Sequence, residues 1–263
     1  MKNTKILYLH YLILFFIMVF LFSCQRPGPE TTSITTGSWR INKDGSYDLT
    51  FEDLSLKNCY PAINDQNIMP LSIEIELHST GGRITYELVE GKLLIDLERD
   101  SSGLKISSEL VGFNKAPDWV MPLGGGRVSG ADRFYKQGFG FAGASGVYQI
   151  PQPEDKIERA VLKENVWSYD SYLFTGLISS NENTLVISAY DHQNYQHRST
   201  IYNKQHRIGL IDRHKDTNEI ILESGFALEE IAIGPKGLKL PDIYIQTGKK
   251  PYATFHEQAQ RIA

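Results

Sequence analysis

Short apolar runs separated by polar turns recur along most of the chain and predict a fold built from β-strands. The clearest pair covers residues 172–178 and 185–190, which are joined by the polar turn 179–183. Both runs are rich in β-branched and aromatic residues, and neither alternates cleanly, a pattern typical of strands covered on both faces. The sequence therefore predicts a hairpin in the middle of a sheet.

A polar and aromatic segment, DHQNYQHR at residues 191–198, follows the predicted hairpin directly. A buried hairpin that ends in such a segment could present a polar surface to a ligand. A solvated strand edge with ordinary tyrosines accounts for the same pattern, because tyrosine is often partly exposed. Both interpretations stay open on sequence alone.

Further strands are predicted along the rest of the chain. Strict alternation over residues 71–77 (LSIEIEL) predicts a strand with one buried and one wet face. The other runs recur roughly every 8–12 residues, the spacing of a β-sandwich. They cover residues 38–41, 47–51, 84–88, 92–97, 104–110, 207–211, 219–222, 226–233 and 242–246, and an Asp-Gly turn joins the first two. We therefore predict an all-β fold, a large antiparallel β-sandwich.

Residues 251–263 (PYATFHEQAQRIA) have helical composition and predict a short C-terminal helix. Phe255, Ala259 and Ile262 fall at positions i, i+4 and i+7, which share one helix face. No C-capping glycine or following proline appears before the sequence ends. A helix that packs back on the sandwich and a helix that leads into a longer protein both fit this pattern.

Residues 114–146 are rich in glycine and aromatic residues. Glycine allows close backbone approach or a positive φ, so this region is expected to be a functional loop that presents aromatic side chains. Gly138, Gly140 and Gly143 match the GxGxxG spacing, but VYQIP at residues 147–151 follows where a dinucleotide-binding motif needs a helix. We therefore exclude a dinucleotide-binding function for the motif.

The N-terminus is predicted to direct the chain to the bacterial cell envelope. Lys2 and Lys5 precede the apolar run 6–22, the layout of a signal peptide. The run ends in LFSC at residues 21–24, which resembles the lipobox of bacterial lipoproteins, where the cysteine is acylated after cleavage. The prediction is a signal peptide over residues 1–24 and a lipid on Cys24 that anchors the protein to the membrane, on the periplasmic or surface side of the outer membrane. An uncleaved helix that spans the bilayer is the alternative, since about 17 apolar residues approach the length required.

Residues 25–36 (QRPGPETTSITT) lack the apolar residues needed for a core and are predicted to be a disordered tether. The sandwich is therefore expected over residues 37–250. If Cys24 carries lipid, Cys59 is the only remaining cysteine and is predicted to be a small core residue.

Composition excludes several functions. The chain of 263 residues is 41% hydrophobic and 22% charged, ordinary globular values. Its net charge of -4 and the lack of a basic run argue against a nucleic-acid partner. Two cysteines cannot build a disulfide framework or a zinc site.

No catalytic, metal or cofactor site stands out. His192 and His197 are five residues apart, so a strand would point them to opposite faces and away from a shared metal. Asp170, Asp191 and Asp212 lie beside strand-like runs and could bind a polyol. Glycoside hydrolysis needs two carboxylates about 5–10 Å apart, and no pair of them is marked as acid and base. We therefore predict no catalytic residue, no metal and no cofactor.

Aromatic residues next to polar ones are the recurring theme. Sugars bind through apolar ring faces that stack on aromatic rings, so the pattern predicts a carbohydrate ligand, although core packing explains any single aromatic residue. The residues concerned are Trp119, Phe139, Trp167, Tyr169, Tyr190 and Tyr195.

Several segments after residue 118 carry a family resemblance. They are GGG at 124–126, DRF at 132–134 with the Gly-Phe segment at 138–141, WSYDS at 167–171, FTGLI at 174–178, and PDIY at 241–244 leading to FHEQ at 255–258. On these segments the chain resembles the N-terminal β-supersandwich domain of α-galactosidase-like glycoside hydrolases (family 36 and its relatives). In that family the sandwich ends with a short helix, and a (β/α)₈ barrel with two catalytic aspartates follows.

Two departures from the family limit what the resemblance implies. The family's aromatic loop carries Gly-aromatic-Gln-Ser-aromatic, whereas residues 138–142 read GFGFA. No position of this chain matches the two barrel aspartates. The resemblance thus implies a non-catalytic N-terminal domain, with residues 251–263 as the start of a helix towards a barrel.

The expected role of this domain is to support and edge a galactoside site. Its candidate substrate-binding residues are Phe139, Phe141, Trp167, Tyr169, Asp170 and His192. A stand-alone glycan-binding surface lipoprotein without enzyme activity is the first alternative, and a purely structural envelope protein is the second. A homo-oligomer is compatible with the sequence. Phe255 and Ile262 should be buried if the helix packs within the chain, and exposed in a wider apolar patch if a barrel covers them.

Overall fold

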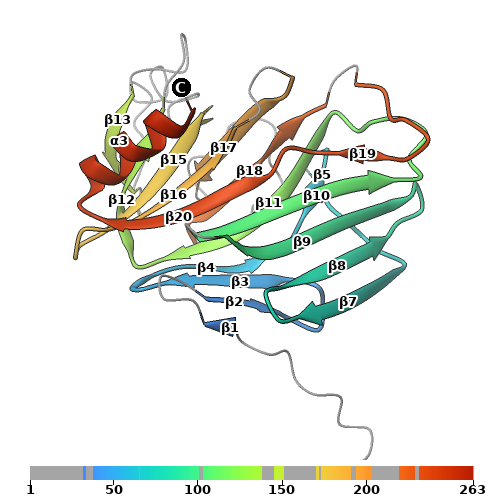
Figure 1. The fold of residues 1–263 in the computed structure, drawn as a ribbon, viewed down its shortest axis with the longest axis horizontal. Helices are drawn as coiled ribbons and strands as arrows, with labels where there is room; N and C mark the ends of the chain where they lie inside the picture. The colour runs from blue at the N-terminus through green and yellow to red at the C-terminus, as the bar shows by residue number, and fades with distance from the viewer. Residues whose placement is uncertain are drawn as a thin grey trace, which may run out of the picture. The chain divides into compact units, whose positions relative to one another are not determined.

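The computed structural model describes residues 32–33, 38–64, 66–100, 103–137, 145–150, 170–171, 173–190, 194–202, 219–228 and 231–262. Two antiparallel sheets form a sandwich, with one helix on the outside of the second sheet (Figure 1). The prediction of an all-β sandwich with a short C-terminal helix is confirmed.

The first sheet, sheet A, has β11 near its centre. Its order is β1 (Thr32–Ser33), β2 (Ser38–Ile41), β3 (Tyr47–Phe51), β4 (Leu54–Cys59), β11 (Trp119–Ser129), β18 (Ile221–Ala227), β17 (Gln196–Tyr202) and β14 (Asp170–Ser171). The short strand β5 (Ala62–Ile63) also pairs with β11, and β6 (Gln66–Asn67) pairs with β5. Strand β1 lies inside the predicted tether 25–36 and pairs with β2.

The second sheet, sheet B, has the central hairpin in its middle. Its order is β13 (Gly146–Gln149), β12 (Ala131–Lys136), β15 (Phe174–Ser179), β16 (Asn183–Ala189), β20 (Ile243–Lys249), β10 (Gly103–Val111), β9 (Lys92–Asp100), β8 (Gly81–Glu87) and β7 (Ser72–His78), with β19 (Leu238–Lys239) beside β10. Helix α3 (Pro251–Ile262) contacts β16 and β20.

One hydrophobic core lies between the sheets and explains the burial pattern of the strands. Its members alternate along β2 and β3, and they continue across β8, β9 and β10 of the other sheet. Tyr47 and Tyr86 are fully buried in this core, and their hydroxyl groups donate hydrogen bonds to the carbonyl oxygens of Pro122 (2.7 Å) and Gly45 (2.6 Å). These bonds satisfy the phenols and tie each tyrosine to a turn or bulge far away in the sequence.

The central hairpin is confirmed as a buried pair of strands. All residues of β15 are buried, and so are those of β16 apart from Asn183. The inner face of the pair packs in the sandwich core, and its outer face packs under α3. The continuous apolar pattern arises because both faces are covered.

The glycine-rich region 114–146 is not the continuous loop that the sequence suggests, since β11 and β12 occupy much of it. Strand β11 is bulged, with register shifts between Val120 and Leu123 and between Leu123 and Gly126. A Cβ at position 124 would overlap the carbonyl oxygen of Tyr60, and Gly125 has a φ of 60°. The glycines therefore permit close packing of strands inside a sheet.

Strand β18 corrects a second prediction. The sequence predicts two strands at 219–222 and 226–233, with a break at Ser224 and Gly225, but a single strand runs through this break. A Cβ at position 225 would lie 2.6 Å from both Cα and Sδ of Met121, because the bulge of β11 passes close over β18. The strand thus needs glycine at position 225 because no side chain fits there. The predicted strand at 207–211 lies outside the described residues.

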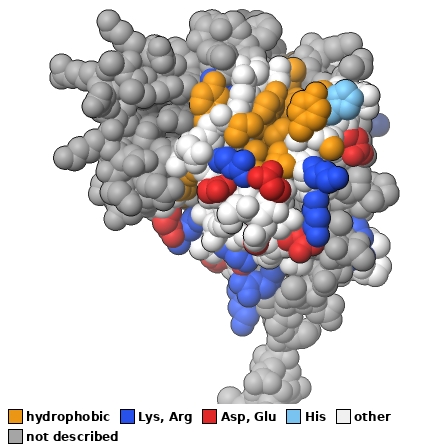
Figure 2. Space-filling view, turned by 90° about the vertical axis from the view of Figure 1, so that its left-hand side faces the viewer, with side chains coloured by type: hydrophobic (Ala, Val, Ile, Leu, Met, Phe, Trp, Pro, Cys, Tyr) orange, Lys and Arg blue, Asp and Glu red, His pale blue; other side chains and the backbone are white. Residues whose placement is uncertain are grey.

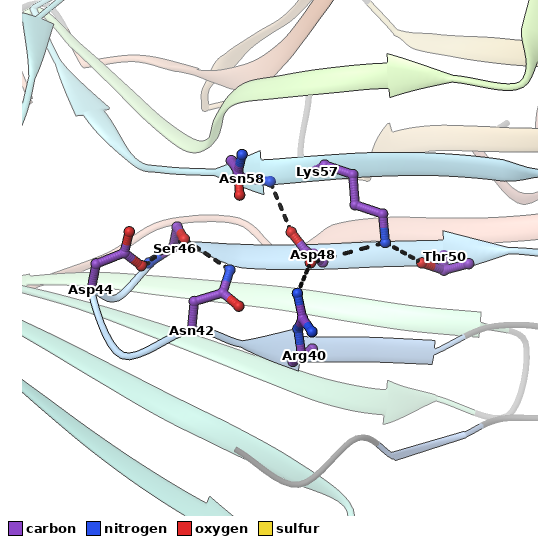
Figure 3. Close-up of polar contacts among 8 residues, drawn as sticks. All are labelled: Arg40, Asn42, Asp44, Ser46, Asp48, Thr50, Lys57 and Asn58. Atoms are coloured by element: carbon purple, nitrogen blue, oxygen red, sulfur yellow. Dashed lines mark hydrogen bonds and ion pairs between the residues drawn. The ribbon is translucent and has the colours of Figure 1, made fainter. Parts of the chain in front are cut away.

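The buried carboxylate of Asp48 lies at a register shift in the pairing of β3 with β4 (Figure 3). Asp48 accepts hydrogen bonds from Arg40 Nη2 (2.8 Å) and from the backbone N–H of Asn58 (2.9 Å), and Lys57 Nζ lies 3.9 Å away. Asn58 has a φ of 54°, so the carboxylate holds a strained backbone position in place. The predicted Asp-Gly turn joins β2 and β3, and Gly45 has a φ of 80° there.

Replacement of Gly225 by alanine tests the close approach of β11 and β18. We expect Gly225→Ala to lower the free energy of unfolding by roughly 1–3 kcal/mol, because the added methyl group forces the bulge at Met121 to move. Urea unfolding followed by circular dichroism measures the change. Gly234→Ala is the matched control, since its nearest neighbour atom would lie 3.9 Å away. Equal unfolding midpoints for the two variants would contradict the interpretation.

Candidate functional site

The described part of the chain includes few of the predicted site residues. Phe139, Phe141, Trp167, Tyr169, His192 and the proposed lipidation site Cys24 lie outside the described residues. Asp170 is the exception, and its backbone pairs with Thr200 in the short strand β14. The described part of the chain therefore does not bring the predicted site residues together.

A groove with a volume of about 840 Å³ lies beside α3. Figure 2 shows apolar side chains gathered on this side of the molecule, with basic and acidic side chains along their lower border and a histidine at one end. The lining comes from β12, β13, β15, the turn after β15, and α3. Its residues are Arg133, Tyr135, Gln137, Val147, Leu173, Phe174, Ile178, Glu182, Lys250, Pro251, Tyr252, Phe255, His256 and Ala259.

Local sequence explains where α3 begins. Lys250 has a φ of 68° and turns the chain out of β20, and Pro251 occupies the first helical position, where its missing N–H costs nothing. The carbonyl oxygen of Lys250 accepts hydrogen bonds from the N–H groups of Ala253 (3.1 Å) and Thr254 (3.2 Å). These bonds form the first turn of the helix.

Two glycines in the strands below make room for the helix. A Cβ at position 176 in β15 would lie 2.7 Å from Cζ of Phe255. A Cβ at position 248 in β20 would lie 3.0 Å from Cγ2 of Thr254. Gly176 and Gly248 therefore leave room for Phe255 and Thr254 where the helix lies on the sheet.

The buried face of α3 differs from the predicted face. Phe255 and Gln258 point to the sheet and are buried, whereas Ala259 is exposed and forms part of the groove wall. Gln258 Nε2 donates a hydrogen bond to Ser188 Oγ on β16 at 2.8 Å, and this polar contact fixes the rotation of the helix. The burial of Phe255 agrees with a helix that packs within the chain, and the side chain of Ile262 lies outside the described residues.

Three stacked aromatic rings form the wall beneath the helix. The ring centres of Tyr135 and Phe255 are 4.5 Å apart, and those of Tyr135 and Phe174 are 5.2 Å apart. Tyr135 also donates a hydrogen bond from its hydroxyl group to Gln137 Oε1 at 2.7 Å. Burial raises the pKa of the Tyr135 phenol, so it stays a neutral hydrogen-bond donor at physiological pH.

Two charged residues at the border of the groove, Arg133 and Glu182, form an ion pair. Arg133 Nη2 lies 2.7 Å from Glu182 Oε1 and also donates to the carbonyl oxygen of Ser179 at 3.3 Å. The hydrogen bond with Glu182 raises the pKa of the Arg133 guanidinium. The lining of the groove is mainly apolar, and Arg133 and Glu182 at its border are paired with each other.

His197 is a core residue and not a ligand for a metal or a sugar. Its exposed fraction is 1%, its Nδ1 lies 3.3 Å from the carbonyl oxygen of Leu173, and its Nε2 lies 2.8 Å from Ser224 Oγ. Cys59 is also fully buried, as predicted, and burial raises the pKa of its thiol.

Within the described ranges there is no cluster of three or more metal-binding side chains. Among those residues there is also no helix long and apolar enough to cross a membrane.

Phe255→Ala tests the attachment of α3. We expect the free energy of unfolding to fall by about 3–5 kcal/mol. Removal of the ring breaks the aromatic stack and creates a cavity above Gly176. Urea unfolding measures the loss, and limited proteolysis followed by mass spectrometry should show earlier cleavage within α3. Tyr252→Ala is the control on the same helix, since Tyr252 is 85% exposed and its loss should change stability by less than about 0.5 kcal/mol. Similar losses for both variants would show that Phe255 does not anchor the helix.

Comparison with known proteins gives a likeness at the level of the fold. No protein-family model matches the chain, and no curated protein sequence matches it. The ligand-free α-N-acetylgalactosaminidase NagBb from Bifidobacterium bifidum aligns with 88% of this chain at a TM-score of 0.57 and 9% sequence identity. The same enzyme in complex with GalNAc aligns over the same share at a TM-score of 0.56 and 8% identity.

The likeness covers only part of that enzyme. This chain spans 38% of the length of NagBb. An α-galactosidase from Thermus thermophilus in complex with stachyose also aligns, with 13% identity over 64% of this chain and 30% of its own, but its TM-score of 0.30 is too low to support an argument. The chain therefore shares its fold with a part of a glycoside hydrolase.

Proposed function

We propose that this chain is the non-catalytic N-terminal β-sandwich of an α-galactosidase-like glycoside hydrolase. The observation that carries the proposal is the match to NagBb, which covers 88% of this chain but only 38% of the enzyme. The segments that resemble the α-galactosidase-like family on sequence grounds support the same assignment.

The groove beside α3 is the proposed surface on which the catalytic domain packs. Contacts between domains of one chain usually bury about 600–1,500 Å², and exposed apolar surface of this kind marks an interaction site. Val147 and Tyr252 project at its border with exposed fractions of 51% and 85%. The groove also lies along α3, the helix that leads in the related family from the sandwich to the barrel.

A glycan-binding function is less well supported at this groove. Sugars need several free polar groups to satisfy their hydroxyls, in addition to an aromatic surface. Here Arg133 is bonded to Glu182, and Tyr135 is bonded to Gln137. The stand-alone glycan-binding lipoprotein therefore remains the second candidate for the whole protein, and the apolar groove favours contact with another domain.

The sandwich would contribute loops to the edge of a galactoside site in the complete enzyme. The residues proposed for that edge are Phe139, Phe141, Trp167, Tyr169, Asp170 and His192. A lipid on Cys24 would hold the protein at the cell envelope, as the N-terminal sequence predicts.

The gene itself provides the first test. We expect the reading frame after the codon for Ala263 to encode a barrel, and the complete gene product to hydrolyse a p-nitrophenyl α-galactoside or α-N-acetylgalactosaminide. The 263-residue chain alone should release no p-nitrophenol above the background. A stop codon followed by unrelated sequence would sink the proposal and leave the stand-alone lipoprotein in first place.

Val147→Arg then tests the docking surface in the complete gene product. We expect the charge to weaken the contact between the domains by about 3 kcal/mol, because an unpaired arginine would be buried there. Differential scanning calorimetry should show the two domains unfolding in separate transitions. Val89→Arg is the control, since Val89 is 80% exposed and does not line the groove. Equal effects of the two variants would exclude the groove as the docking surface.

A further inference from the structure

Strand β7 is the last strand of sheet B, and among the described residues it pairs with β8 alone (Figure 1). Its seven residues include no proline or glycine, and their pairing with β8 has no register shift. The other end strands of the two sheets are shorter over the described ranges, since β1 and β14 have two residues each and β13 has four. An edge strand of this length presents a row of backbone N–H and C=O groups with which another strand can pair.

A stripe of half-covered apolar side chains follows the face of β7 that points to the core. Ile73 and Ile75 pack against the sandwich core but remain partly exposed. Leu77 is 41% exposed, and Leu71, which directly precedes the strand, is 70% exposed. The four residues are two apart in sequence, the spacing of side chains on one face of a strand. A strand added to this edge would cover the stripe and pair the backbone groups at the same time.

The opposite face of β7 is acidic, because Glu74 and Glu76 are exposed there. Two neighbouring cations on β8 and β9 are already paired with other carboxylates, as Arg83–Asp96 (2.7 Å) and Lys92–Glu87 (2.7 Å). The edge strand therefore carries an excess of negative charge. Opposite charges on directly opposed residues stabilise a strand pair, so this charge favours a strand with basic residues at the matching positions.

A second copy of β7 fits this edge poorly. Residues directly opposite each other in an antiparallel pair point to the same face. With Ile75 opposite Ile75, each Glu74 would face Glu76 of the other copy. A shift by two residues would bring Glu74 opposite Glu74 or Glu76 opposite Glu76. Like charges in these positions destabilise the pair, so the pattern favours a partner of different sequence.

We propose that β7 adds an extended strand of a partner protein to sheet B, a strand in which apolar residues alternate with lysine or arginine. Its apolar residues extend the stripe of residues 71–77, and its basic residues face Glu74 and Glu76. This edge is separate from the groove, whose strands β12, β13 and β15 lie at the other end of sheet B. The interaction goes beyond the proposed function and requires no catalytic domain, so it can be tested on this chain alone.

Titration of the chain with designed peptides provides the direct test. The N-acetylated and C-amidated peptide TKVKVKVT alternates valine with lysine, and TEVEVEVT differs from it only in the sign of its charges. We expect the lysine peptide to shift the backbone amide signals of residues 72–78 in an NMR spectrum in a saturable manner, and the glutamate peptide to cause no saturable shift. No saturable shift with the lysine peptide, or equal shifts with both peptides, would overturn the proposal. Dimerisation of the peptide-free chain through residues 72–78, measured by sedimentation at neutral pH, would overturn it in favour of a second copy.

A reversal of the charges on β7 tests the role of its carboxylates. The double variant Glu74→Lys/Glu76→Lys should bind the lysine peptide about tenfold more weakly and should gain saturable binding of the glutamate peptide, because attraction and repulsion change places. Glu52→Lys/Glu257→Lys is the charge-matched control, since both residues are exposed and lie away from β7, in the turn after β3 and on α3. Equal losses in the two double variants would show that net charge attracts the peptide and would exclude the edge as its binding site.

Discussion

The close approach of β11 to its neighbours is the constraint on which most of this sandwich depends. The strand lies between β4 and β18, and its bulges bring its backbone so near to both that Gly124, Gly126 and Gly225 have little space for a side chain. A buried carboxylate, Glu223, satisfies the N–H of Gly125 in the middle of this irregular strand. Without such a partner, a bulge in a buried strand would leave a costly orphan N–H group.

The same strand connects the outer face of sheet A with the groove beside α3. It begins at Trp119, which stacks on Arg198 on the outer face of sheet A. It ends at Ser129, and the chain then passes through Gly130 into β12, which lines the groove of sheet B. Gly130 has a φ of 83°, and a Cβ there would overlap the carbonyl oxygen of Asp53. One rigid segment thus fixes both an aromatic ring in one layer and the groove wall in the other.

Local sequence predicted the parts of the fold that depend on local interactions. Strands β2 and β3 begin and end where the alternation and the Asp-Gly turn indicate, and the apolar pattern of the central hairpin reports its burial on both faces. The sequence predicts a loop at the glycines of β11 and a strand break at Gly225, but these glycines lie within strands. They make room for residues far away in the chain, such as Tyr60 and Met121. Spacing alone also cannot predict that α3 turns Gln258 and not Ala259 toward the sheet, because Ser188 on another strand decides it.

Side chains that meet across the sheets show the same limit. Arg133 and Glu182 are 49 residues apart in sequence and meet only because β12 pairs with β15. The sequence marks Trp119 and the segment 191–198 as aromatic and polar, but the contact of Arg198 with Trp119 depends on the register of the sheet.

The fit of Phe255 over Gly176 also limits how related sequences can diverge. The ring occupies the space that any Cβ at position 176 would need, so neither position is free to change alone. A homologue with a larger residue at position 176 can keep the helix in place only with a smaller residue at position 255. A homologue with phenylalanine at position 255 needs glycine at position 176. Positions 176 and 255 should therefore covary among homologues, and a conserved Gly-Phe pair at this separation would identify distant members that share the docked helix.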